Sequence, residues 1–232
     1  MTTPSRLATG CTRARPGGRA TYNAGVSSSV RKVAEADFPT RWGQFRLHGF
    51  EGDFDNGGEA RHETAVALVM GDVVASSLGP PLVRVHSQCL TGDVFGSLRC
   101  DCRQQLEMAL SMIAEAGRGV MLYEQQEGRG IGLMAKLQAY ELQDRGMDTV
   151  EANQELGFKA DQRQFQLPGE ALKLLGVTQV RLLSNNPEKV AALENSGIKV
   201  VERVPCEVDA QHTAEEYLKV KKEKMGHLFS RR

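Results

Sequence analysis

The stretch that decides the fold is residues 106–123, LEMALSMIAEAGRGVMLY, because a helical pattern and a strand pattern follow one another in it. Its first part places apolar residues at i, i+3, i+4 and i+7, and Gly117 ends the run, which predicts a helix with one buried face. Residues 120–123 are then a short, continuous apolar run, which is typical of a buried strand. A helix that leads directly into a buried strand indicates α/β construction.

The rest of the chain continues this alternation on both sides of that stretch. Downstream, the patterns predict a helix at 133–142, a helix at 172–175, a strand at 180–183, a helix at 187–193, a strand at 198–201 and a last helix marked by Tyr217, Lys221 and Met225. Upstream, they predict strands at 42–50, 65–69 and 83–86, with a loop or hairpin connection over residues 51–61. No internal repeat or linker follows residue 38, so we expect one domain.

Composition places the chain among globular proteins with a sizeable core, since it has 232 residues and a hydrophobic content of 41%. No apolar run reaches the roughly 18 residues that span a bilayer, and the N-terminus lacks the apolar stretch of a secretory signal. We therefore expect a cytoplasmic protein without a membrane partner. Lys plus Arg equals Asp plus Glu at 29 each, so the total charge neither indicates nor excludes an anionic partner.

The N-terminal part differs in composition from the rest. Residues 1–32 contain six basic residues, no acidic ones and many Ser, Thr and Gly, which is typical of a disordered basic tail. An organellar transit peptide has a similar composition, although the arginines show no clear helical spacing. Because no aromatic residues alternate with these arginines, we expect a solvated tail and no nucleic-acid partner.

Three of the five cysteines form a candidate metal site. Cys89 lies eleven residues before Cys100, and Cys102 follows two residues later. An odd number of cysteines without a secretory signal favours metal binding or catalysis over disulfides. Three thiolates would leave the fourth tetrahedral position of a zinc ion for water, which is the catalytic arrangement. Two alternatives stay open: His86 as a fourth ligand of a structural zinc, or three buried core cysteines. Cys11 and Cys206 stand alone and are interpreted as plain thiols.

A second candidate site is the glycine-rich stretch from Gln126 to Gly132, QEGRGIG. Its three glycines would let the backbone approach a ligand closely. Arg129 suits phosphate oxygens, and Glu127 suits the amidine edge of a guanine, which offers two hydrogen-bond donors. The alternative is a tight strand-to-helix connection without a ligand.

Together these segments resemble GTP cyclohydrolase II. The resemblance begins with residues 84–93, RVHSQCLTGD, and 97–102, SLRCDC, and continues through the Glu127 loop. Further matching positions follow in the family's order: Tyr140, 148–153, 156–158, Asp161, Arg163, 185–187 and 222–227. The resemblance covers residues 33–228, which we take as the catalytic domain, leaving 229–232 as a C-terminal tail. It implies a single α/β domain with a mixed sheet and flanking helices.

The resemblance also implies a reaction and its residues. The reaction is zinc-dependent hydrolysis of GTP to formate, diphosphate and a diaminopyrimidinone that carries a phosphoribosylamino group, the first committed step of riboflavin biosynthesis. The zinc ligands would be Cys89, Cys100 and Cys102, and Mg²⁺ would accompany the triphosphate. Arg163 matches the family's proposed nucleophile, Asp161 its proton acceptor and Tyr140 a further active-site residue. The implied GTP contacts are Arg84, Val85, His86, Ser87, Gln88, Gln105, Glu127, Gly128, Arg129, Thr149, Ser184 and Lys189. A homodimer is also implied.

Alternatives remain for parts of this assignment. Arginine is effectively always protonated, so a purely electrostatic role is the alternative to Arg163 as a nucleophile. A second alternative is that Arg163 and Asp161 form an ordinary surface ion pair. Gln88, Gln125 and Ser184 stand where the family often has Glu, Arg and Thr. These positions leave open a product that keeps the formyl group or has a differently processed ribose phosphate. A separate competing function is a zinc-stabilised nucleotide-binding or regulatory domain without turnover.

Overall fold

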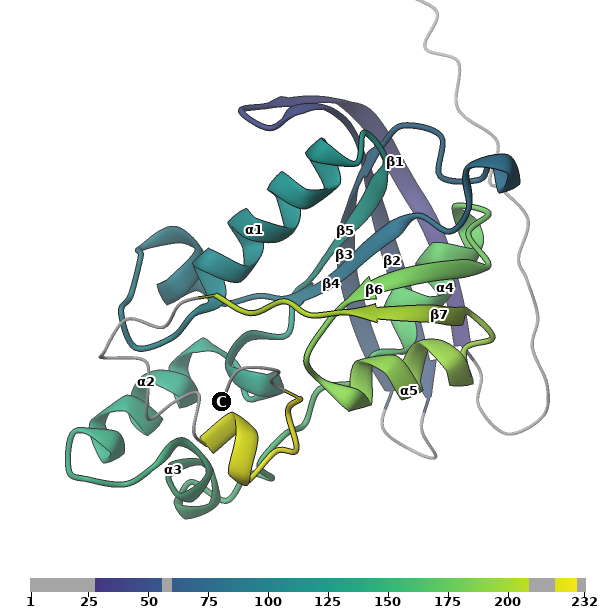
Figure 1. Cartoon of the computed structure of the whole chain (residues 1–232). Coiled ribbons are helices and arrows are strands. Elements are labelled where there is room, and N and C mark those ends of the chain that lie inside the picture. Colours follow the sequence, from purple (N-terminus) through teal and green to yellow (C-terminus); the bar gives the residue numbers. More distant parts are fainter. Residues whose placement is uncertain (1–27, 56–59, 209–219, 229–232) are drawn as a thin grey trace, which may run out of the picture.

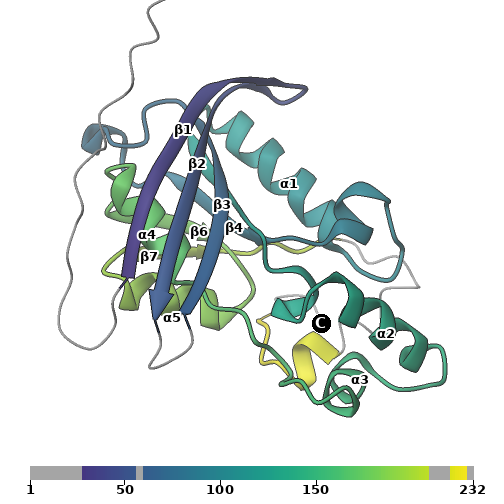
Figure 2. The same ribbon diagram turned by 180° about the vertical axis from the view of Figure 1, so that it is seen from behind.

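The computed structural model describes residues 28–55, 60–208 and 220–228, and these form a seven-stranded sheet with helices on both faces. The strands are β1 (Ser28–Thr40), β2 (Gly43–Asp55), β3 (Ala60–Met70), β4 (Leu82–Ser87), β5 (Gly119–Glu124), β6 (Gln179–Leu183) and β7 (Lys199–Val204). Their spatial order is β1-β2-β3-β5-β4-β6-β7 (Figures 1 and 2). β1, β2, β3 and β5 pair antiparallel, whereas β5, β4, β6 and β7 pair parallel. The expectation of an α/β domain with a mixed sheet is confirmed.

The helices lie between and beyond these strands. They are α1 (Cys102–Glu115), α2 (Leu133–Gln143), α3 (Thr149–Glu155), α4 (Gln166–Leu174) and α5 (Pro187–Asn195). Shorter turns are the 3₁₀ segments Ser76–Leu78 and Glu127–Gly130 and the π turn Leu90–Val94. No helix in the described ranges is long and apolar enough to cross a membrane.

Two hydrophobic cores lie on opposite faces of the sheet because strand residues alternate in direction. In β5, Val120 and Leu122 belong to the core beneath α4 and α5, whereas Met121 belongs to the core beneath α1. β2 divides in the same way, with Phe50 in the first core and Phe45 in the second. This explains why the strand at 120–123 reads as a continuous apolar run, since both of its faces are buried.

The apolar residues that predicted the α1 helix form its buried face. Ala109, Leu110 and Ile113 are buried against Met121 and Leu82, as the helical spacing predicts. The predicted helices at 133–142, 172–175 and 187–193 correspond to α2, the end of α4 and α5. Of the predicted last helix, Tyr217 lies outside the described residues, whereas Lys221 lies in a helical turn.

Two boundary predictions were wrong. Residues 51–61 were expected to form a loop or hairpin connection; β2 and β3 do form an antiparallel hairpin, but β2 continues to Asp55 and β3 begins at Ala60, with Asp53 opposite His62. The polar residues there occupy outward strand positions, while Gly52 and Phe54 face inward. The tail was expected to reach residue 32, but β1 begins at Ser28 and pairs with Phe54. Backbone pairing with β2, together with the packing of Val30 on the larger core, orders residues 28–32. Residues 1–27 and 229–232 lie outside the described ranges.

The parallel strands determine where a site can form. β4, β5 and β6 end at Ser87, Glu124 and Leu183, so the segments that follow them meet at one edge of the sheet. Figure 1 shows α2, α3 and the C-terminal turn grouped beyond this edge, apart from the two cores. In open α/β sheets, ligands bind outside the carboxyl ends of the parallel strands.

Candidate active site

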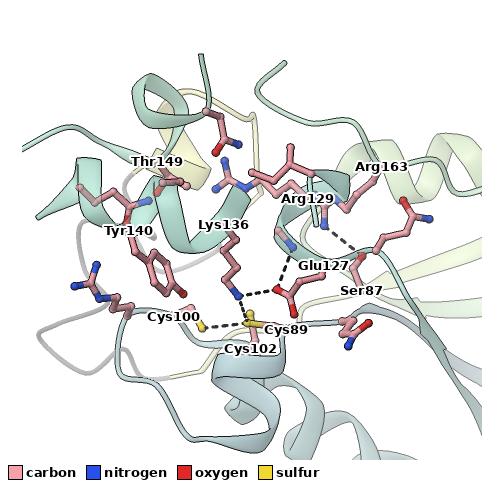
Figure 3. A pocket seen from close by; sticks show the side chains of 18 residues that line it. Ser87, Cys89, Cys100, Cys102, Glu127, Arg129, Lys136, Tyr140, Thr149 and Arg163 are labelled. Carbon is pink, nitrogen blue, oxygen red and sulfur yellow. Dashed lines mark hydrogen bonds and ion pairs between the residues drawn. The ribbon is translucent and has the colours of Figure 1, made fainter. Parts of the chain in front are cut away.

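The three cysteines converge beyond the end of β4. Cys89 precedes the π turn Leu90–Val94, Cys102 is the first residue of α1, and Cys100 lies two residues before it. Their Sγ atoms all lie within 4.8 Å of one another, and those of Cys89 and Cys100 are 3.7 Å apart (Figure 3). A Cβ at Gly92 would lie 2.9 Å from the Cys100 sulfur and 3.1 Å from that of Cys89. Gly92 is therefore part of the cradle around the sulfur atoms.

This cluster fits a zinc ion chemically. Hydrogen bonds with Cys100 and Cys102 lower the pKa of Cys89, whereas those with Cys100 and Cys89 raise the pKa of Cys102, so the thiolate form that binds metals is favoured first at Cys89. Three thiolates suit Zn²⁺ and leave one tetrahedral position for a further ligand. The cluster lines a cavity, so that position has access to a small molecule.

The alternative in which His86 closes the coordination shell is not supported. Its Nε2 lies 3.2 Å from both carboxylate oxygens of Asp93, and its ring stacks on Tyr123 with centroids 5.5 Å apart. Burial lowers the pKa of His86, so the imidazole is neutral, and its Nε2–H donates to the Asp93 carboxylate. Within the described ranges, the group with metal-binding geometry consists of the three cysteines alone.

Cys206 lies outside the cluster. Its side chain is fully buried, and its backbone N–H and C=O pair with the side-chain amide of Asn185 at 3.0 and 2.8 Å. This agrees with its interpretation as a plain thiol. Cys11 lies outside the described residues.

Lys136 joins the cysteine cluster to the glycine-rich loop, and sequence reasoning did not identify it. Its Nζ donates hydrogen bonds to Glu127 Oε1 at 2.7 Å and Cys89 Sγ at 3.3 Å (Figure 3). It also donates to Thr91 Oγ1 at 2.9 Å. Its ammonium also lies 5.6 Å from the centre of the Tyr140 ring. Lys136 and Tyr140 are four residues apart on α2, so they share one face of the helix. That spacing is the sequence signal that would have linked them.

Glu127 is held on several sides. Its carboxylate accepts hydrogen bonds from Leu90 N at 2.6 Å and Gly128 N at 3.0 Å, in addition to the one from Lys136. The side chain is buried yet lines the cavity beside the cysteines. Its position is thus fixed before any ligand arrives.

The loop that follows Glu127 has an unusual backbone. Gly128 and Arg129 are both left-handed, with φ of 63° and 62°. A non-glycine residue in this region is strained, and such strain concentrates at functional sites. Gly130 lets the loop pack against residues 162 and 163, since an added Cβ would lie 3.1 Å from the Gln162 carbonyl carbon.

Asp161 and Arg163 form a buried bidentate pair. The guanidinium Nε donates to Asp161 Oδ1 at 2.9 Å and Nη2 donates to Oδ2, while Nη1 lies 3.3 Å from Ser87 Oγ. Their side chains are only 13% and 12% exposed, so the surface ion pair considered from the sequence is wrong. Burial acts to raise the pKa of Asp161, but the hydrogen bonds and charge of Arg163 lower it, so the carboxylate is ionised.

A second cavity adjoins the first. Four residues line both, and they are Ser87, Cys102, Arg129 and Arg163. The second cavity is rich in cations and hydrogen-bond donors, with a lining that includes Arg84, Gln105, Ser184, Asn186, Lys189, Lys221 and His227. Both cavities are lined by cations, which in the first are Arg99, Arg129, Lys136 and Arg163, but the first combines them with all three cysteines and the Glu127 carboxylate.

Lys189 is the most deeply placed cation of the second cavity. It is 5% exposed, and its Nζ donates to Val85 O at 2.9 Å and Ser87 Oγ at 3.0 Å. Glu124, which the sequence did not single out, lies 3.9 Å away and accepts a hydrogen bond from Ser87 Oγ. Burial lowers the pKa of Lys189 to about 7 and raises that of Glu124.

The structure brings nearly all predicted residues to these two cavities. The first is lined by Ser87, Gln88, Glu127, Gly128, Arg129, Tyr140, Thr149, Arg163 and the three cysteines, and the second also by Arg84, His86, Gln105, Ser184 and Lys189. There are two exceptions. The Val85 side chain lies in the hydrophobic core and only its carbonyl oxygen reaches Lys189. Asp161 lines neither cavity and is hydrogen-bonded to Arg163, which lines both. Gln125 is exposed and lines neither cavity.

The comparisons with known proteins agree with this geometry. The family model described as GTP cyclohydrolase II matches residues 31–205. GTP cyclohydrolase-2 of Cronobacter sakazakii is 57% identical over 201 residues, covering 87% of this chain and 98% of that protein. GTP cyclohydrolase-2 of Escherichia coli O9:H4 is 55% identical over 202 residues, covering 87% and 99%. A solved two-domain 3,4-dihydroxy-2-butanone 4-phosphate synthase from A. baumannii aligns at a TM-score of 0.34 and 18% identity, covering 67% of this chain and 34% of that one, which supports no conclusion. The chain belongs to the GTP cyclohydrolase II family.

Proposed function

We propose that this enzyme hydrolyses GTP in a zinc-dependent reaction that opens the imidazole ring and releases formate and diphosphate, the first committed step of riboflavin biosynthesis. The observation that carries the proposal is the junction of two cavities at Arg163. One holds all three cysteines and Glu127 beside its cations, and the other is lined by further cations, Arg84, Lys189 and Lys221. A nucleoside triphosphate has a base and a polyphosphate that need such different surroundings. Family membership supports the same substrate.

Cys89, Cys100 and Cys102 would hold the zinc. Bound there, zinc supplies the Lewis acidity that makes water a nucleophile toward carbon 8 of the purine. Gly92 keeps the space between the sulfurs free of side-chain atoms. Lys136 places a positive charge beside the Cys89 sulfur and offsets part of the excess negative charge of three thiolates.

The base would lie in the first cavity. Glu127 Oε1 already accepts hydrogen bonds from Lys136 and Gly128, whereas Oε2 accepts only from the Leu90 N–H and so offers a further lone pair to a guanine N–H. Tyr140 lines the same cavity, with its hydroxyl 3.1 Å from Thr91 Oγ1. Burial raises the pKa of Tyr140, so it acts as a neutral hydrogen-bond donor to the opening ring.

The triphosphate would lie in the second cavity, where Arg84, Arg129 and Lys189 offset its negative charge. Mg²⁺ would arrive with the triphosphate and neutralise part of it. Arg163 stands between the two cavities and would face the α-phosphate. In this assignment an Arg163 nitrogen attacks that phosphorus, the bond to the bridging oxygen breaks, and diphosphate leaves with that electron pair. Asp161, ionised and bonded to the guanidinium, takes the proton. Water then cleaves the phosphorus–nitrogen bond to yield the monophosphate.

The experiment that tests the proposal follows both products of the reaction. Purified protein loaded with zinc is incubated with GTP and Mg²⁺, and formate, diphosphate and the mass of the nucleotide product are measured. We expect all three to match complete ring opening. Binding of GTP without consumption would identify a nucleotide-binding protein instead. Diphosphate without formate would identify a product that keeps the formyl group.

A matched pair of cysteine variants tests the metal assignment. Cys100→Ser removes one proposed ligand, and we expect it to lose both zinc and formate release. Cys206→Ala removes a fully buried thiol outside the cluster and should keep its zinc. Loss of formate release in Cys100→Ser with a full complement of zinc would refute the ligand assignment. We further expect a cytoplasmic homodimer, which sedimentation and fractionation would check.

A further inference from the structure

The C-terminal residues 220–228 are built into the second cavity, although no role was assigned to them from the sequence. The Leu228 N–H donates to Asn185 O at 2.9 Å, and the His227 N–H donates to Lys221 O at 3.0 Å. Lys221, Met225 and His227 line the cavity together with Arg84 and Lys189. Figure 1 shows this turn lying beyond the sheet edge near α3.

Lys221 reaches from this segment to the cysteine cluster. Its Nζ donates to Asp101 Oδ1 at 2.7 Å, and the two side chains are 10% and 3% exposed. Asp101 is the residue between the two proposed ligands Cys100 and Cys102. A buried carboxylate that loses its cation is left with an uncompensated charge, so the position of Asp101 depends on Lys221.

Asp101 occupies the position before α1 at which an aspartate ordinarily caps a helix. Its side chain makes no capping hydrogen bond to the α1 backbone. Both carboxylate oxygens are used elsewhere: Oδ1 binds Lys221, and Oδ2 accepts from Gln105 Nε2 at 2.6 Å. The Asp101 carboxylate therefore binds Lys221, 120 residues away, and makes no capping hydrogen bond to α1. A side chain held in this way fixes the backbone that carries Cys100 and Cys102.

The same contacts continue toward the phosphate side. Gln105 Oε1 accepts from Arg84 Nη2 at 2.6 Å, and Arg84 Nη1 donates to Leu183 O at 2.9 Å. A continuous series of hydrogen bonds therefore runs from Lys221 through Asp101 and Gln105 to Arg84.

We propose that Lys221 is a positioning residue for the metal site, which acts through Asp101 to hold Cys100 and Cys102 in ligating geometry and to join that loop to Arg84 in the basic cavity. The inference rests on the proposed function in naming zinc as the ion. It assigns the C-terminal segment a part in assembling the site. Partners of this kind, one step removed from a metal, change its affinity by about 10–100-fold.

The test measures zinc affinity without any turnover. Full-length Lys221→Met, Lys221→Arg and Asp101→Asn are titrated with zinc against a chromophoric chelator, and the thiolate-to-metal absorption of the cobalt-loaded forms is recorded. Lys222→Met, an exposed neighbour on the same segment, is the matched control. We expect Lys221→Met to bind zinc about tenfold or more weakly with an altered cobalt spectrum. Lys221→Arg should restore most of the affinity, and Lys222→Met should equal the wild type.

Coupling between the two residues separates positioning from a general loss of stability. If Lys221 acts through Asp101, the double variant Lys221→Met/Asp101→Asn binds zinc no more weakly than the poorer single variant. Additive losses overturn the proposal, as does zinc affinity in Lys221→Met equal to that of the control. If circular dichroism shows that Lys221→Met does not fold, the zinc affinity of Asp101→Asn tests the proposal. An affinity equal to that of the wild type then overturns it.

Failure of the proposed function is recognised separately. A wild-type protein that takes up no zinc refutes the metal site itself and this inference with it. A wild-type protein that binds zinc but does not consume GTP refutes only the reaction, because the affinity comparison needs no substrate.

Discussion

Replacing Gly92 by alanine perturbs the cysteine cluster with a single methyl group. The new Cβ would lie 2.9 Å from the Cys100 sulfur, 3.1 Å from the Cys89 sulfur and 3.2 Å from Cys102 Cβ. Gly92 does not have the left-handed conformation that favours glycine, so the backbone itself tolerates alanine. The whole effect therefore comes from crowding among the three proposed ligands.

The expected size follows from these contacts. Overpacking a filled site costs about 1–3 kcal/mol, and if the sulfurs move apart to relieve it, the cost appears in metal binding. That corresponds to a loss of zinc affinity of about 5–150-fold, because every 1.4 kcal/mol is tenfold. The measurement is competition for zinc with a chromophoric chelator, together with formate release at saturating zinc.

Gly96 in the same loop provides the matched control. It is left-handed with φ of 68°, and an added Cβ would meet only Arg103 Nη1 at 3.6 Å. Gly96→Ala should therefore lower the free energy of unfolding by about 1–2 kcal/mol through its backbone and leave zinc affinity unchanged. Zinc affinity in Gly92→Ala within threefold of the wild type would refute the idea that the sulfurs share one ion.

Three further predictions concern other parts of the molecule. Because the pKa of Lys189 is lowered to about 7, its charge is present below that pH and lost above it. Affinity for a non-hydrolysable GTP analogue should therefore fall as the pH rises from 6 to 9. Lys189→Arg should flatten this pH profile. An equally steep profile in that variant would contradict the assignment. Lys136→Met removes the cation bonded to Glu127 and Cys89, and kcat/KM for GTP should fall about 10–100-fold, whereas unchanged kinetics would show that Lys136 is dispensable. Phe50 is 1% exposed in the larger core, so Phe50→Ala should lower the free energy of unfolding by about 3–5 kcal/mol in urea titrations; a loss below 1 kcal/mol would contradict its place there.

The fold was predictable where side chains carry the signal. The apolar spacing in α1 and the apolar run of β5 predicted both elements, because one face of α1 and both faces of β5 pack on a hydrophobic core. Prediction failed at the bounds of residues 28–32 and 51–61, where Val30 and Phe54 are isolated apolar residues among polar ones. In those places the backbone ladder between β1, β2 and β3 provides the order. Every residue has the same backbone groups, so a ladder leaves little trace in composition.

The cysteines and the glycine-rich loop were predictable because each is a local pattern of unusual residues. Lys136 and Lys221 were not placed in advance, because each acquires its role from partners distant in the sequence. Lys136 contacts Cys89, 47 residues earlier, and Lys221 contacts Asp101, 120 residues earlier. The sequence alone does not distinguish these two lysines from the others.

Charge shows most clearly why the rest of the site could not be read from the sequence. The totals are equal at 29 each, yet folding gathers Arg84, Arg129, Arg163, Lys189 and Lys221 around one cavity. Several of these cations have carboxylate partners behind them, as Arg163 has Asp161 and Lys221 has Asp101. Such pairing lets cations be buried before a ligand arrives, because an isolated buried charge would be too costly. An anionic ligand therefore meets cations that are already held in place, and removing a carboxylate should weaken its binding even though the site becomes more positive.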